Sequence, residues 1–120
     1  MSYFQEANNL YNLKNYKDAL HMYNKAILSN DNEADSLYNA GVCLIKLKEY
    51  ENAIIYLKRA VQKKRESKYF FNLGYCHAML NDSKKALIFF NKAWSLDCED
   101  DDCRKAINII LNWYSSKMSP

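Results

Sequence analysis

Residues that interrupt helices are nearly absent from this chain of 120 residues. It contains two glycines and one proline, and the proline is the final residue, Pro120. Glycine and proline are the residues least compatible with a helix interior, so their scarcity favours a helical chain. Hydrophobic residues make up 49% and charged residues 26%, which are ordinary proportions for a folded domain and argue against disorder.

Signals for membrane insertion and export are also absent from the sequence. No apolar run approaches the about 18 residues that a membrane-spanning helix needs. No basic segment followed by an apolar one marks the N-terminus for secretion. We therefore expect a cytoplasmic protein with no membrane partner. The net charge of +3 is too weak to indicate a nucleic-acid-binding protein by itself.

Patterns that carry catalysis are missing as well. The chain has no glycine-rich phosphate loop, no His–Glu metal spacing and no serine elbow. An enzyme needs a nucleophile, a base and an orienting group in one pocket. Of the two histidines, His77 falls in an apolar helical pattern and His21 on an outward helix side. We expect no enzyme activity and no cofactor.

The strongest positive signal is a twelve-residue pattern that occurs three times, over residues 16–27, 50–61 and 83–94. Each copy has alanine at its fourth and eleventh positions and a large residue at its eighth. The copies begin 34 and then 33 residues apart (16 to 50, 50 to 83). A fixed period of this size indicates stacked helical units rather than one ordinary core.

Each unit divides into two helices joined by a short link. In the second unit, apolar residues at helical spacing predict helices over residues 34–47 and 50–63. The link Lys48-Glu49 is short enough to require an antiparallel helix hairpin. Asn15 and Asp82 are expected to cap the second helices of the other two units, whereas Glu49 is a poor cap.

Small residues recur where paired helices should approach. Ala7, Gly41 and Gly74 lie twelve residues before Ala19, Ala53 and Ala86, respectively. We expect these positions to meet small against small between the two helices of each pair, so that a large side chain there would clash.

The C-terminal part departs from the repeat. An acidic run, Glu99–Asp102, precedes a predicted helix over residues 101–116, where carboxylates favour the positive helix N-terminus. No glycine hinge or distal glutamate completes a calcium loop. Ala106, Ile107, Ile110, Leu111 and Tyr114 are predicted to share one side of this helix, which covers the open end of the third unit.

The four cysteines divide into two kinds. Cys43 and Cys76 occupy equivalent places in successive units and are expected to be small buried residues. Cys98 and Cys103 flank the acidic run. Zinc requires four closely spaced ligands, so we expect no metal site. Plain thiols are favoured there, and a local disulfide is the alternative.

These residues together resemble the tetratricopeptide repeat. Its pattern of a large residue, a hydrophobe, a small residue and a further large residue, followed by Ala, aromatic and Ala, is matched closely in the second and third units. The first unit is looser, with Glu6 where a hydrophobe is usual. The resemblance implies an all-α fold, an α-solenoid of three antiparallel helix pairs with a C-terminal capping helix. It covers one domain, 1–120, with repeats at about 1–33, 34–66 and 67–100 and the capping helix at about 101–116.

The resemblance also implies that first helices line a concave groove that holds peptides or protein segments, in an adaptor or a chaperone. A second stripe on each first helix supplies the candidate groove, where exposed apolar clusters usually mark a partner site. Its residues, with neighbouring polar positions, are Phe4, Asn8, Tyr11, Asn12, Tyr38, Asn39, Val42, Ile45, Lys46, Lys68, Phe71, Asn72, Tyr75 and Met79. Packing between neighbouring units is the competing explanation for any one of them.

Some members of this family grip a terminal carboxylate with a clamp of Lys, Asn and Arg. Asn8, Asn39 and Lys68 match three of its five places, but Phe4 replaces a Lys and Asn72 replaces the Arg. Because two of three cations are lost, most of the charge complement is missing. An apolar peptide groove is therefore favoured over the clamp.

Two other kinds of partner are alternatives to a peptide. A basic run from Lys58 to Lys68 at the end of the second unit could attract nucleic acid, but a solvated helix end explains it and no nucleic-acid partner is expected. Self-assembly is the second alternative, because no helix precedes the first unit and its residue 1–11 edge could pair with a second copy as a homodimer.

Overall fold

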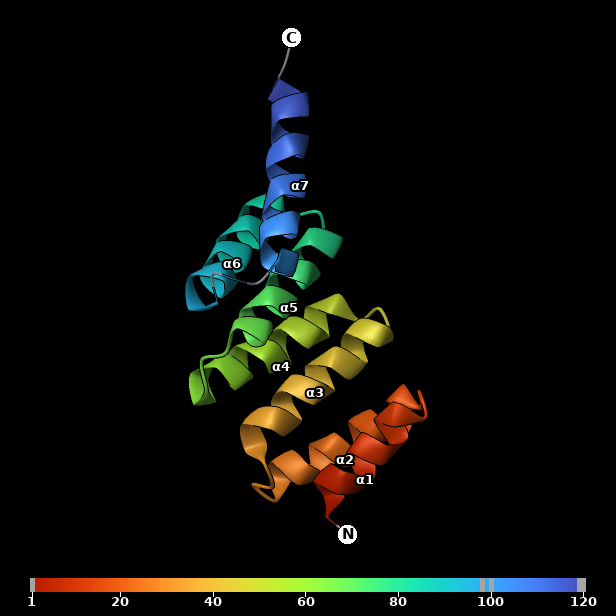
Figure 1. The fold of residues 1–120 in the computed structure, drawn as a ribbon. Coiled ribbons are helices and arrows are strands. Elements are labelled where there is room, and N and C mark those ends of the chain that lie inside the picture. Colours follow the sequence, from red (N-terminus) through yellow and green to blue (C-terminus); the bar gives the residue numbers. More distant parts are fainter. Residues whose placement is uncertain (1, 98, 100, 119–120) are drawn as a thin grey trace. The chain divides into compact units, whose positions relative to one another are not determined.

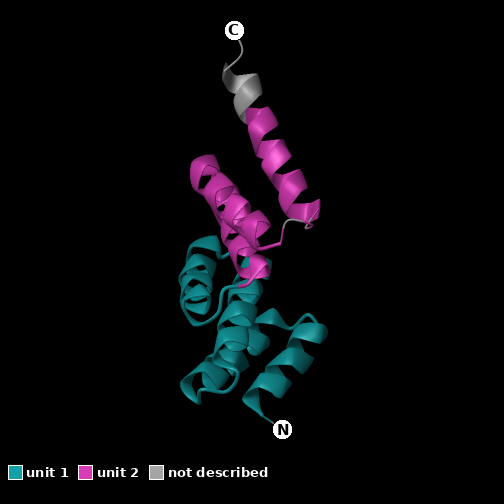
Figure 2. Ribbon diagram, turned by 60° about the vertical axis from the view of Figure 1, so that its left-hand side comes forward, with its two compact units in different colours: residues 1–65 teal, residues 66–120 magenta. Residues whose placement is uncertain are grey.

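The computed structural model describes residues 2–97, 99 and 101–118, with side chains placed as far as Trp113. Within these residues the elements are seven α-helices and no strand (Figure 1). The chain forms two compact units, residues 1–65 and 66–120 (Figure 2).

The first unit contains two helix pairs. Helix α1 packs on α2, α3 packs on α4, and α2 also contacts α3, so that the two pairs stack. The helices are α1 (Tyr3–Asn12), α2 (Tyr16–Leu28), α3 (Glu33–Lys46) and α4 (Tyr50–Lys63).

The second unit contains one helix pair and a third helix. They are α5 (Ser67–Met79), α6 (Ser83–Leu96) and α7 (Asp101–Met118). Helix α6 contacts both α5 and α7. The predicted fold class, three helix pairs followed by a capping helix, is confirmed.

The turn inside each pair has the same backbone geometry three times. Lys14, Lys48 and Asn81 lie in the left-handed region, with φ of 63°, 62° and 63°. In each turn the next residue donates its N–H to a carbonyl five positions back, as Asp82 does to His77 at 2.8 Å. This pattern satisfies the end of the first helix and reverses the chain.

Only one of the two expected caps forms. The Asp82 side chain accepts a hydrogen bond from the Lys85 N–H at 3.1 Å, as predicted. The prediction for Asn15 is wrong: its amide instead donates to the Asp18 carboxylate at 2.8 Å. Glu49 makes no side-chain cap, in line with its expected weakness.

The two glycines on first helices make room for a large side chain of the second helix. A Cβ added to Gly41 would lie 2.9 Å from Leu57 Cγ and 3.5 Å from the Ala53 carbonyl oxygen. A Cβ added to Gly74 would lie 2.6 Å from Phe90 Cδ1. Each glycine thus faces the large residue sixteen positions later, Gly41 also lies beside the Ala53 backbone, and a larger side chain at either glycine would clash, as expected.

The capping helix closes the second unit with an apolar face. Ile107 and Ile110 pack against Ala86 and Phe90 of α6, and Phe71 joins the edge of this cluster. Leu111 was expected on the same side, but its side chain is 47% exposed. The buried face runs through positions 103, 107 and 110, which places residue 111 beyond its edge. The side chain of Tyr114 lies outside the described residues.

Candidate functional site

The first unit carries a polar network that joins α1, α2 and α3. Oδ1 of Asn8 accepts a hydrogen bond from the Tyr23 hydroxyl and one from the Asn39 amide at 3.5 Å. Tyr23 is buried, and burial raises the pKa of its hydroxyl, which therefore stays a neutral donor at physiological pH. The network fixes the two asparagines, which come from neighbouring first helices.

Aromatic residues flank this network on α1. The Phe4 ring lies 6.1 Å from the Tyr23 ring, and the Phe4 N–H donates to the Asp31 carboxylate at 3.3 Å. The Tyr11 ring meets Tyr16 edge to face at 5.4 Å, and partial burial raises the pKa of Tyr11. Both candidate residues are half-buried, so each presents part of its ring to solvent.

The rest of the candidate set in this unit is also partly or fully accessible. On α3 the half-buried members are Tyr38, Asn39, Val42 and Ile45. Asn12 and Lys46 are exposed. None of the candidates in the first unit belongs to its fully buried core.

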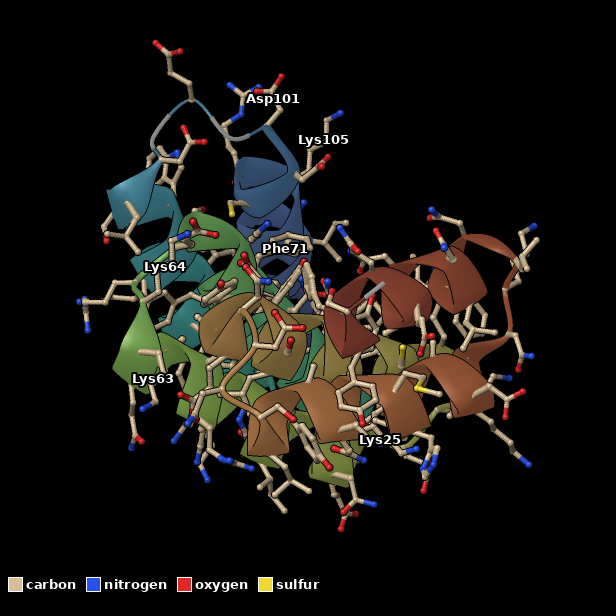
Figure 3. All side chains as sticks on the ribbon, turned by 90° about the horizontal axis from the view of Figure 1, so that it is seen from below. Lys25, Lys63, Lys64, Phe71, Asp101 and Lys105 are labelled. Carbon is tan, nitrogen blue, oxygen red and sulfur yellow. The ribbon has the colours of Figure 1, made fainter. Side chains whose placement is uncertain are left out.

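In the second unit the candidates divide into packed and accessible residues. Phe71 lies 5.2 Å from the Phe90 ring and contributes to the core under α7. Its position on α5 is labelled in Figure 3. Tyr75 and Met79 are 38% and 46% exposed. Phe71 is thus largely structural, whereas Tyr75 and Met79 present surface.

The residues at the clamp positions make local contacts in the structure. Lys68 Nζ lies 3.7 Å from a Glu66 carboxylate oxygen, at an exposed site. The Asn72 amide donates to the Lys68 carbonyl of its own helix at 2.9 Å. Asn72 therefore supplies no cation where the clamp pattern has arginine.

One histidine and two cysteines, which are residue types that can take part in catalysis, are buried in the packed interior. His77 is buried and stacks parallel to Phe89, with ring centroids 5.3 Å apart. Cys43 and Cys76 are buried free thiols, and burial raises the pKa of each to about 12. Such thiols are protonated at neutral pH and are poor nucleophiles.

The remaining two cysteines belong to the second unit. Cys103 is buried on α7, and Cys98 lies outside the described residues. Among the residues that the structure describes, no three His, Cys, Asp or Glu side chains gather where they could hold a metal ion. The described helices also include none that is long and apolar enough to cross a bilayer.

One feature of the second unit escaped the sequence prediction. A pocket opens between the α5–α6 turn and the capping helix, and Ile109 and Trp113 of α7 form part of its wall. Their spacing of four residues was the available signal, since it places them on one helix side.

Solved structures similar to this chain share its fold. The first tetratricopeptide domain of Spaghetti (RPAP3), bound to the HSP90 peptide SRMEEVD, has a TM-score of 0.89 at 16% identity, with 94% of this chain and 90% of that chain covered. The Yersinia enterocolitica type III secretion chaperone SycD, in complex with a peptide of the translocator YopD, has a TM-score of 0.87 at 15% identity, covering 93% and 92%. The second such domain of human RPAP3, in complex with the HSP70 peptide SGPTIEEVD, has a TM-score of 0.85 at 20% identity, covering 91% and 92%.

Sequence comparison identifies the repeats themselves. No curated protein sequence gives a significant match. One tetratricopeptide repeat profile matches residues 4–68, and a second matches residues 67–97. The chain belongs to the tetratricopeptide repeat family.

Proposed function

We propose that this chain is a protein-interaction module that holds a peptide or protein segment against its first helices, as an adaptor or chaperone. The support from relatives is that three proteins of the same fold carry bound peptides. The candidate residues are those predicted from the sequence on α1, α3 and α5.

The observation that carries this proposal is the fixed pair of asparagines among partly exposed aromatics in the first unit. Asn8 Oδ1 is engaged by Tyr23 and Asn39, and within the described residues its amide N–H groups make no further bond. An amide held in this way can donate to a peptide carbonyl without losing further side-chain freedom.

The chemistry around the asparagines favours an apolar or mixed segment. Phe4, Tyr11 and Tyr38 offer aromatic surface at low entropic cost, as protein-binding sites often do. A carboxylate clamp is the second candidate, favoured by Asn8, Asn39 and Lys68 at matching positions. The exposed setting of Lys68 beside Glu66 limits what that single cation contributes.

The test begins with a random twelve-residue peptide display library selected on the full chain. Enriched peptides are then synthesised and titrated by calorimetry against the wild-type chain, Asn39→Ala and Asn52→Ala. Asn52 is an exposed asparagine on α4 and serves as the matched control.

The expected result is enrichment of peptides whose affinity falls about tenfold in Asn39→Ala and stays unchanged in Asn52→Ala. The proposal is wrong if selection yields no peptide that binds the full chain in solution. Equal loss in the two asparagine variants would move the site away from the first helices.

A further inference from the structure

The second unit has a pocket that the candidate groove does not include. It has a volume of about 240 Å³ and is lined by Ala78, Asn81, Ser83, Ile109, Ile110 and Trp113. The lining comes from the end of α5, the α5–α6 turn, the start of α6 and the outer half of α7. The volume is below the roughly 300–1,000 Å³ of sites for small molecules, so it suits one inserted side chain.

The apolar wall on α7 lies outside the face that closes the core. The buried face of α7 holds Cys103, Ile107 and Ile110. Ile109 is 68% exposed and Trp113 is 45% exposed, although both border the pocket. A branched aliphatic and an indole, four residues apart on one helix side, form a partly exposed apolar wall beside the buried face of α7.

The polar and charged residues around the pocket indicate which residue of a bound peptide could lie next to an inserted apolar side chain. Asn81 and Ser83 supply hydrogen-bonding groups to the lining. Lys84 follows Ser83, and Lys105 lies one helical turn before Ile109. Both lysines are exposed, and among the described residues neither is in an ion pair (Figure 3 labels Lys105).

Nearby carboxylates are mostly engaged elsewhere. Asp82 caps α6 and lies 4.0 Å from the Lys85 ammonium, and Asp101 pairs with Arg104 at 2.9 Å. Asp102 lies one turn before Lys105, further from the pocket along α7. Lys84 follows a lining residue and Lys105 lies one turn before another, so these two cations can complement an acidic residue next to the anchor.

We propose that this pocket is an anchor site for a peptide that carries a bulky apolar side chain beside an acidic residue. The apolar side chain inserts between Ala78 and the Ile109–Trp113 wall, and the acidic residue faces Lys84 or Lys105. This inference rests on the proposed peptide-binding function.

The test uses the peptides selected on the full chain and a matched pair of exposed isoleucines. Ile109 borders the pocket, whereas Ile88 on α6 is 64% exposed and outside its lining. Affinities are measured for wild type, Ile109→Ser, Trp113→Ala and Ile88→Ser. Each peptide is also made with its apolar residue replaced by alanine, which completes a double-mutant cycle.

A second readout follows the pocket directly. The chain contains two tryptophans, so Trp94→Phe leaves Trp113 as the only indole. Peptide binding is expected to shift Trp113 emission to shorter wavelength, because the indole leaves water. The peptide with alanine at the anchor position should give a much smaller shift.

The proposal expects peptide binding to be about tenfold weaker in Ile109→Ser and Trp113→Ala and unchanged in Ile88→Ser. In Ile109→Ser, replacing the apolar anchor residue of the peptide by alanine should cause no further loss of affinity. Peptides that bind all four chains equally would overturn the anchor site and leave the proposed function standing. If no peptide binds any of them, the proposed function fails too. If sedimentation shows that Ile109→Ser dissociates a dimer without affecting peptides, the occupant is a second copy and the proposal is wrong.

Discussion

Replacing Gly74 with alanine should destabilise the chain more than the same change at Gly41. Both glycines lie inside first helices and face a large residue of the second helix. At Gly74 the new Cβ would lie 2.6 Å and 2.7 Å from two ring atoms of Phe90. At Gly41 it would lie 2.9 Å and 3.1 Å from the Cγ and one methyl of Leu57.

The magnitude follows from two opposing effects. Alanine is favoured over glycine in a helix interior by about 1 kcal/mol. Overpacking a filled core costs about 1–3 kcal/mol. Phe90 is rigid and is held on another side by Phe71, Ile107 and Ile110, so it cannot move away cheaply. Leu57 is smaller and more adaptable. We expect a net loss of about 1–2 kcal/mol for Gly74→Ala and about zero for Gly41→Ala.

Chemical denaturation followed by circular dichroism measures both free energies of unfolding. Phe90→Leu provides the control, because a smaller residue leaves room for the new methyl group. The cost of Gly74→Ala should therefore shrink when Phe90→Leu is present. If Gly74→Ala is as stable as Gly41→Ala, or if Phe90→Leu does not rescue it, the packing described for the second unit is wrong.

Three other predictions concern stability. Ala53→Leu should lower the melting temperature well below that of Lys85→Leu, because Ala53 is fully buried and Lys85 is exposed; equal melting temperatures would contradict the pairing of α3 with α4. Removing residues 101–120 should lower both melting temperature and solubility, since it uncovers the apolar surface beneath α7; a truncated chain that melts like the full one and stays monomeric would refute the capping role. Burial raises the pKa of the Cys43 and Cys76 thiols from 9.0 to about 12, so the folded chain holds these protons more tightly and stability should fall as pH rises from about 9 to 12. Thermal melts across that range should show a shallower fall for Cys43→Ala, and an unchanged slope would contradict the prediction.

The helices and their order could be predicted from sequence because the repeat is strongly periodic. The α4 bounds, Tyr50–Lys63, agree with the predicted residues 50–63. Periodicity shows which side of a helix is apolar but not how far one helix slides along another. That is why the sequence pairs Gly41 with Ala53 but does not show that Leu57 also fills the space beside Gly41.

The limits of periodicity also explain the errors on the capping helix. The helical pattern predicts Leu111 on the apolar side with Ile107 and Ile110, but its position falls beyond the edge of the buried face. The roles of Ile109 and Trp113 depend on where α7 passes the α5–α6 turn, which no local pattern encodes. The Asn15 cap failed for a related reason, because Asp18 offers its amide a competing acceptor.

The sequence predicts which positions belong to the groove, but it does not show which of these side chains stay accessible and which pack in the core. The sequence predicts Asn8 and Asn39 as groove residues, and the structure joins them through Oδ1 of Asn8, which accepts a hydrogen bond from the Asn39 amide. The sequence predicts Phe71 in the groove, yet its ring packs on Phe90, because the capping helix lies over that part of the third pair. These three residues therefore differ in what they can offer a partner.

The most direct test of the central claim is calorimetry with peptides selected on the full chain, at low and high salt, against Tyr38→Ala, Tyr75→Ala and Lys68→Ala. Circular dichroism first establishes that each variant is folded. Peptide binding by the first helices predicts a loss of about 1–3 kcal/mol for each tyrosine variant, a smaller loss for Lys68→Ala, and weak salt dependence. A large loss from Lys68→Ala with steep salt dependence, and none from the tyrosine variants, would contradict it in favour of a carboxylate clamp.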